Sequence, residues 1–115
     1  MCALKGIREL CRAGQEAQER GDHMQAEFLL RQALHGAEGL GSPVLEAKIM
    51  NTIGVFAMVQ GSAAKSVSTL GLALEKVRFR LGTENKLFAA IERNLQEAER
   101  LLAVKHAAPA VTYAA

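Results

Sequence analysis

The sequence contains few aromatic residues: Phe, Tyr and Trp together make up 4% of the 115 residues, and Trp does not occur. Hydrophobic residues nevertheless reach 50%, so the core must be filled by Leu, Ala, Val, Ile and Met, which favour close helix packing. A chain of this length corresponds to one domain and can bury roughly two thirds of its unfolded surface. The composition therefore predicts an all-α domain.

The sequence also lacks a large excess of one charge sign. It has 14 basic and 12 acidic residues, and its formal net charge is +2. Such a balance does not attract polyanions or anionic lipids, so we expect no nucleic-acid partner. The longest apolar run, Ile53 to Val59, is far shorter than the about 20 residues that span a bilayer. The first residues lack the apolar stretch of a signal peptide. We therefore expect a cytoplasmic protein with no membrane partner.

Cysteine and histidine are scarce. Cys2 and Cys11 are nine positions apart, which on one helix separates their Cα atoms by roughly 13 Å, beyond the reach of a disulfide. We expect reduced thiols. His23, His35 and His106 show neither His-Glu-x-x-His nor Cys-x-x-Cys spacing, and no phosphate-binding loop occurs. The sequence thus predicts no metal site, no cofactor and no enzymatic activity.

Glycine-containing breaks at residues 21–22, 39–43, 61–62 and 81–83 divide the chain into five segments with helical periodicity. The predicted helices are 3–20, 23–38, 44–60, 62–81 and 83–104, with Ser62 as the N-cap of the fourth. The third is apolar around most of its circumference, which indicates that other helices surround it. Residues 105–115 are Ala-rich, contain Pro109 and lack periodicity, so we expect a disordered tail.

A repeat of 40 residues relates the first two pairs of segments. With this offset Gly21 matches Gly61, and the same offset pairs Gly14 with Gly54, Ala17 with Ala57, Leu30 with Leu70, Ala33 with Ala73 and Leu34 with Leu74. A repeated unit that cannot bury its apolar face alone implies a stacked architecture. The small residues at matching places indicate where two helices approach closely.

These residues resemble the tetratricopeptide repeat, in which a small residue on helix A lies seven positions before a turn glycine, and small, large and small residues follow on helix B. The matching residues are Gly14, Gly21, Ala26, Leu30 and Ala33 in the first unit and Gly54, Gly61, Ser66, Leu70 and Ala73 in the second. The unit is similar to the longer, 40-to-42-residue variety. Leu10 and Met50 replace the aromatic residues of helix A, and Ser66 replaces the usual Ala.

The resemblance covers about residues 3–102 and implies antiparallel helix hairpins stacked as a short right-handed α-α solenoid. In that case one domain spans residues 1–104, with repeat 1 at about 3–40, repeat 2 at about 44–81 and a terminal helix at about 83–104. The terminal helix is a helix A without its partner. Its register stays open, because different matches give offsets of 41 and 42 from the second unit.

In this family the A helices line a groove that holds a peptide or a helix of a partner. The resemblance therefore implies a non-catalytic, protein-binding adaptor or regulatory module of unknown partner. The partner-binding positions that it assigns are Arg8, Cys11, Gln15 and Gln18 in the first unit and Lys48, Asn51, Val55 and Met58 in the second. This groove would be polar and weakly basic.

Two other functions stay open. A chain with fewer than three complete repeats is near the lower limit for a stable stack, so it could be a structural protein that forms a homodimer. More remotely, Arg100 and His106 have an Arg-x5-His spacing that resembles the active motif of small helical ribonucleases of the HEPN class. The basic residues Lys65, Lys76, Arg78 and Arg80 are interrupted by Glu75 and favour a solvated helix face over an RNA-binding surface.

Overall fold

The computed structural model describes the backbone of residues 2–114 and the side chains of residues 3–106. It contains five helices and, within this part of the chain, no strand. The helices are α1 (Cys2–Glu19), α2 (His23–Gly39), α3 (Pro43–Val59), α4 (Ala63–Leu81) and α5 (Lys86–Ala114). The structure confirms the predicted all-α architecture of helix hairpins, and the first four helices begin and end within one residue of the predicted bounds.

Each of the four connections contains a glycine with a left-handed backbone: Gly21, Gly41, Gly61 and Gly82 have φ angles of 82°, 65°, 85° and 77°. A residue with a Cβ is strained in this conformation. After α1, the Asp22 amide donates to the Ala17 carbonyl at 2.9 Å and the Gly21 amide to the Gln18 carbonyl at 3.0 Å, which is a Schellman ending. The glycines therefore end the helices where the sequence predicts the breaks.

The helix starts are capped in different ways. Asp22 and Ser42 accept hydrogen bonds from the backbone amides of Gln25 and Leu45, at 3.2 and 3.3 Å, as N-cap residues do. Ser62 occupies the predicted N-cap position of α4, but its side chain makes no capping hydrogen bond. Ser62 is therefore at the predicted N-cap position, but it does not cap the helix with its side chain.

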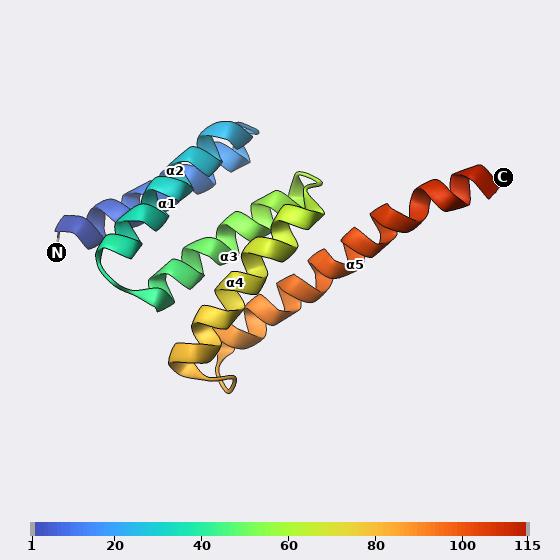
Figure 1. Cartoon of the computed structure of the whole chain (residues 1–115). Coiled ribbons are helices and arrows are strands. Elements are labelled where there is room, and N and C mark those ends of the chain that lie inside the picture. Colours follow the sequence, from blue (N-terminus) through green and yellow to red (C-terminus); the bar gives the residue numbers. More distant parts are fainter. Residues whose placement is uncertain (1, 115) are drawn as a thin grey trace.

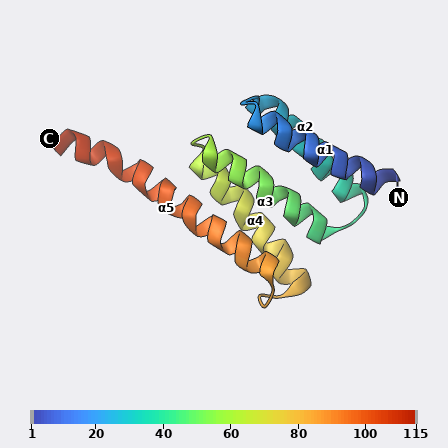
Figure 2. The same ribbon diagram turned by 180° about the vertical axis from the view of Figure 1, so that it is seen from behind.

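The helices form two layers. Figure 2 shows α1, α3 and α5 toward the viewer, and Figure 1 shows the opposite side with α2 and α4 in front. Along the array α1 packs on α2, α3 on α4 and α4 on α5, while α2 contacts α3 across the junction of the two hairpins. The molecule measures 59 × 35 × 19 Å. The radius of gyration is 15.6 Å, against about 13 Å for a compact domain of about 100 residues, and the projecting end of α5 contributes to this length (Figure 1). The main helix contacts join successive helices and α3 with α5, so the helices form an open array and not a closed bundle.

Two apolar clusters hold the array together. One lies between the first hairpin and α3 and contains Ile7, Leu30, Ala33, Ala37, Ile49 and Ile53. The other joins α3, α4 and α5 and contains Ala47, Met50, Leu70, Ala73, Val77, Ile91 and Ala98. Leu34 packs against both. The large apolar surface of α3 is explained by its position between neighbours on both sides.

Close helix approach inside each hairpin depends on glycine. A Cβ added to Gly14 would lie 3.0 Å from Leu30 Cγ, and one added to Gly54 would lie 2.6 Å from Leu70 Cγ. Ser66, the counterpart of Ala26 in the first unit, is fully buried and donates a hydrogen bond of 2.7 Å to the Gly54 carbonyl oxygen. Its hydroxyl thus connects α4 to α3 at their closest crossing.

The prediction for α5 was wrong at both ends. The helix begins at Lys86 and not near Thr83, because Asn85 caps it: Asn85 Oδ1 accepts from the Phe88 amide at 2.7 Å. It continues to Ala114 instead of ending near Val104, so the predicted disordered tail 105–115 is helical up to Ala114. This segment is rich in Ala, which has the highest helix propensity.

Candidate functional site

The four positions expected on α1 lie at the surface or close to it. Arg8 and Gln15 are exposed, and Cys11 and Gln18 are half-buried. Gln18 Oε1 lies 2.9 Å from Nδ1 of His23, at the start of α2. Cys11 packs against the cluster between the first hairpin and α3, and this burial raises the pKa of its thiol. Arg8 and Gln15 are therefore the α1 side chains best placed to reach a partner.

The four positions expected on α3 are less exposed than those on α1, because several of them make contacts within the chain. Lys48 is exposed, and Asn51, Val55 and Met58 are half-buried. Asn51 Oδ1 accepts a 3.0 Å hydrogen bond from Nδ2 of Asn94 on α5. Met58 packs against the cluster of α3, α4 and α5. Lys48 is the most available of the four.

The predicted residues lie on one layer of the array but not in one pocket. They belong to α1 and α3, which share the face seen in Figure 2. Of the two helices of the first hairpin, α2 and not α1 makes most of the contact with α3. We name the side of this layer seen in Figure 2 the A face. Helices α1 and α5 carry several exposed residues, whereas Lys48 is the one exposed residue among the four positions expected on α3.

Burial decides the register of α5 that the sequence leaves open. Ile91 and Ala98 are fully buried. An offset of 41 matches them to Met50 and Ala57, which are buried on α3, whereas an offset of 42 would match Ala98 to half-buried Phe56. With the offset of 41, the residues in line with Lys48, Asn51, Val55 and Met58 are Ala89, Glu92, Gln96 and Glu99, and all four are exposed. The α5 end of the A face is thus acidic.

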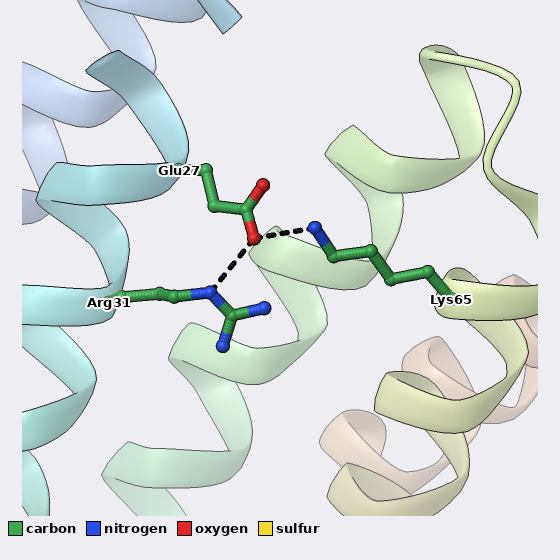
Figure 3. A network of polar contacts seen from close by, with 3 residues as sticks. All are labelled: Glu27, Arg31 and Lys65. Carbon is green, nitrogen blue, oxygen red and sulfur yellow. Dashed lines mark hydrogen bonds and ion pairs between the residues drawn. The ribbon is translucent and has the colours of Figure 1, made fainter. Parts of the chain in front are cut away.

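A charged contact that sequence patterns did not reveal joins the two hairpins. Figure 3 shows the Glu27 carboxylate of α2 between Arg31 of the same helix and Lys65 of α4. Arg31 Nε donates to Glu27 Oε2 at 2.8 Å, and Lys65 Nζ donates to the same oxygen. The hydrogen bond from Lys65, followed by that from Arg31, lowers the pKa of Glu27. The Arg31 pair has ordinary helical spacing, but no local signal links Glu27 to a lysine 38 residues away.

The remaining basic residues of α4 are paired in a similar way. Lys76 Nζ lies 3.1 Å from Oε1 of buried Glu46, and Arg78 Nη2 lies 2.6 Å from Glu75 Oε1. Together with Lys65, three of the four basic residues noted on this helix are bound to carboxylates. These three side chains therefore form ion pairs within the chain.

Two shallow depressions lie on the opposite layer, where no site was predicted. One, of about 530 Å³, is lined by Leu10, Phe28, Arg31, Gln32, His35 and Gly36. The other, of about 430 Å³, is lined by Pro43, Glu75, Lys76, Arg78, Phe79 and Arg80. Phe28 and Phe79 are 57% and 86% exposed. Exposed aromatic residues on the second helix of each hairpin are the signal that could have pointed to these depressions.

The proposed ribonuclease pair is not brought together within one chain. Arg100 makes two hydrogen bonds to the Glu97 carboxylate, at 2.6 and 3.0 Å, which raise its pKa. His106 is exposed six residues further along α5, about 9 Å away along the axis and about 120° around it. The two side chains point in different directions.

Among the described side chains, no group of three or more His, Cys, Asp and Glu could hold a metal ion. Cys11 is a free thiol, whereas the side chain of Cys2 lies outside the described residues. None of the described helices has the length and apolarity needed to cross a membrane.

Comparison of the chain with protein-family models, with curated proteins and with solved structures gives no match.

Proposed function

We propose that this chain is a non-catalytic, tetratricopeptide-like interaction module that binds a peptide or a helix of another protein on its A face. The array supports the proposal, because α1 keeps one side exposed, and α3, which lies between neighbours, still exposes Lys48 and leaves Asn51, Val55 and Met58 half-buried. The proposal includes a cytoplasmic setting, in which a free thiol such as Cys11 persists.

The observation that carries the proposal is that α1 and α3 expose polar side chains while most of their apolar side chains are buried or half-buried. Helix α1 buries one side in its hairpin and exposes Arg8 and Gln15, whereas α3 is enclosed by its neighbours and exposes Lys48 as its one polar group. The two cations favour a partner segment with carboxylates at the α1 and α3 end. Stacked helical repeats use extended surfaces of this kind for binding.

Affinity capture with charge-reversed variants tests the proposal. The wild-type chain and the Arg8→Glu/Lys48→Glu variant are used to capture partners from the source organism. Both side chains are exposed, so the fold should persist, and we expect recovery of the specific partners to fall at least about tenfold, since two attractive contacts become repulsive.

A matched control changes the same number of charges elsewhere. Arg20, at the turn after α1, and Arg80, on α4, are exposed and lie off the proposed face. Arg20→Glu/Arg80→Glu should recover the same partners as the wild type. Equal recovery by the A-face variant and the wild type would move binding off this surface.

A further inference from the structure

The two complete hairpins show which positions of an A helix face its own B helix. Gly14 and Gly54 lie against Leu30 and Leu70, as the short distances to an added Cβ show. Seven residues earlier, Ile7 lies against α2, since its Cγ1 would be 2.9 Å from a Cβ at Gly36. Seven residues later, Gly21 and Gly61 make the left-handed turns into α2 and α4.

Helix α5 carries large apolar residues at the same three positions. The offset of 41 places Phe88 in line with Ala47, Leu95 with Gly54, and Leu102 with Gly61. Leu95 carries a large side chain at the position where the glycines make room for a B helix, and it packs in part against the cluster of α3, α4 and α5. Leu102 cannot make the left-handed turn without strain. Both substitutions agree with the observed continuation of α5 as one helix to Ala114.

The result is an apolar stripe on the side of α5 where a B helix would otherwise lie. Phe88, Leu95 and Leu102 are half-buried and recur every seven residues, the spacing of a helix that packs side chains into the gaps of another helix. Glu92 and Glu99 are exposed and lie on one edge of the stripe. On α4, Val67 and Leu74 are half-buried and pack against the same cluster as Phe88 and Leu95.

We propose that this stripe, named the α5 stripe for Phe88, Leu95 and Leu102, docks an amphipathic helix of another protein that carries an apolar heptad and basic residues along its edge. The leucines match an apolar seam, and the two glutamates match Lys or Arg at its flank, the positions that set partner choice between paired helices. Glu92 and Glu99 also belong to the α5 end of the A face, so the two surfaces adjoin, but the α5 stripe lies on α5 alone and does not require binding at Arg8 and Lys48.

Charge also disfavours a second copy of the chain as the occupant. If two α5 helices paired in antiparallel fashion about Leu95, Glu92 of one copy would lie close to Glu99 of the other, and the reverse. Like charges at such positions oppose pairing. A basic partner helix instead pairs its cations with the carboxylates of Glu92 and Glu99, so the repulsion does not arise.

Two synthetic helical peptides test the proposal. Both have four heptads with Leu at the a and d positions, and they differ only in having Lys or Glu at the flanking e and g positions, so that each repels itself and stays monomeric. Fluorescence anisotropy with the full chain should show binding of the Lys peptide and at least about tenfold weaker binding of the Glu peptide. Glu92→Lys/Glu99→Lys should reverse this preference, and Leu102→Glu should abolish it.

Controls separate this surface from the A face and from self-association. Glu9→Lys/Glu19→Lys, a matched change of exposed α1 residues, and Arg8→Glu/Lys48→Glu should both keep the preference for the Lys peptide. The proposal is overturned if the wild type binds neither peptide or both equally. It is also overturned if equilibrium sedimentation shows a stable wild-type dimer that Leu102→Glu dissociates, because the occupant is then a second copy.

Discussion

At the scale of single residues, the crossing of α3 and α4 depends on the missing side chain of Gly54. Leu70 is fully buried, and its Cγ and Cδ2 would both lie 2.6 Å from a Cβ at this position. A buried leucine that is held on all sides cannot move away without disturbing the core. The same residue type is therefore required at Gly54 for a packing reason and at Gly61 for a backbone reason.

Replacing Gly54 by Ala should lower the free energy of unfolding by about 1–3 kcal/mol, the usual cost of overpacking a core. Gly71 is a matched control, because it lies within α4 and an added Cβ meets nothing within 4 Å. Gly71→Ala should raise the free energy of unfolding by about 0.5–1 kcal/mol through helix propensity. Urea unfolding measures both. A Gly54→Ala variant as stable as Gly71→Ala would contradict the close contact with Leu70.

A second close contact shows why residue patterns alone predict only part of the packing. Gly36 on α2 lies against Ile7, whereas the equivalent residues of the second unit are Lys76 and Ala47. In the first unit the large residue is on helix A and the small one on helix B, and in the second unit this order is reversed. Lys76 Nζ lies 3.1 Å from Glu46 Oε1. Such compensation conserves volume between neighbours, and it cannot be read from either position by itself.

At the scale of the elements, the first hairpin is attached to the second by apolar contacts of α2 with α3 and by the Glu27 ion pairs. Glu27 is the acceptor for both Arg31 and Lys65, and its side chain is 32% exposed. Because its pKa is lowered in the fold, the ionised carboxylate stabilises the folded state above the pKa of Glu in the unfolded chain. This contribution is lost as the pH falls through the lowered value.

Glu27→Gln should therefore destabilise the chain at pH 7, by less than about 1 kcal/mol because the pair is partly solvated. The difference from the wild type should shrink toward zero at a pH well below about 4, the ordinary range for Glu. Thermal unfolding at several pH values measures it. Glu16→Gln is the control, since Glu16 pairs only with Arg12 on its own helix, at 3.5 Å. A pH-independent effect of Glu27→Gln would show that charge is not its cause.

The helix bounds could be predicted where only one residue type adopts the backbone conformation that the position requires. Gly21 and Gly61 end α1 and α3 because little else adopts their backbone conformation. The start of α5 was not predictable, because Thr83 and Asn85 are both capping residues and only the chain path after Gly82 selects Asn85. The contacts of Asn51 with Asn94 and of Glu27 with Lys65 join residues 43 and 38 positions apart, and no local pattern encodes them.

At the scale of the whole molecule, the two hairpins and α5 lie side by side and do not form a closed bundle. Both proposed binding surfaces depend on this arrangement. The thin dimension of 19 Å corresponds to two layers of helices, each about 10 Å across. An open array exposes both the A face and the α5 stripe, whereas a closed five-helix bundle would bury one of them. The repeat predicted the stacked hairpins, but it did not predict the contacts that set one hairpin against the next, such as that of Glu27 with Lys65.

Small-angle X-ray scattering of the full-length chain at dilute concentration tests this central claim most directly. The open array predicts a radius of gyration close to 15.6 Å and a longest dimension close to 59 Å. A nearly spherical particle with a radius of gyration of about 13 Å, the value for a compact domain of about 100 residues, would contradict it and remove the basis for both binding surfaces.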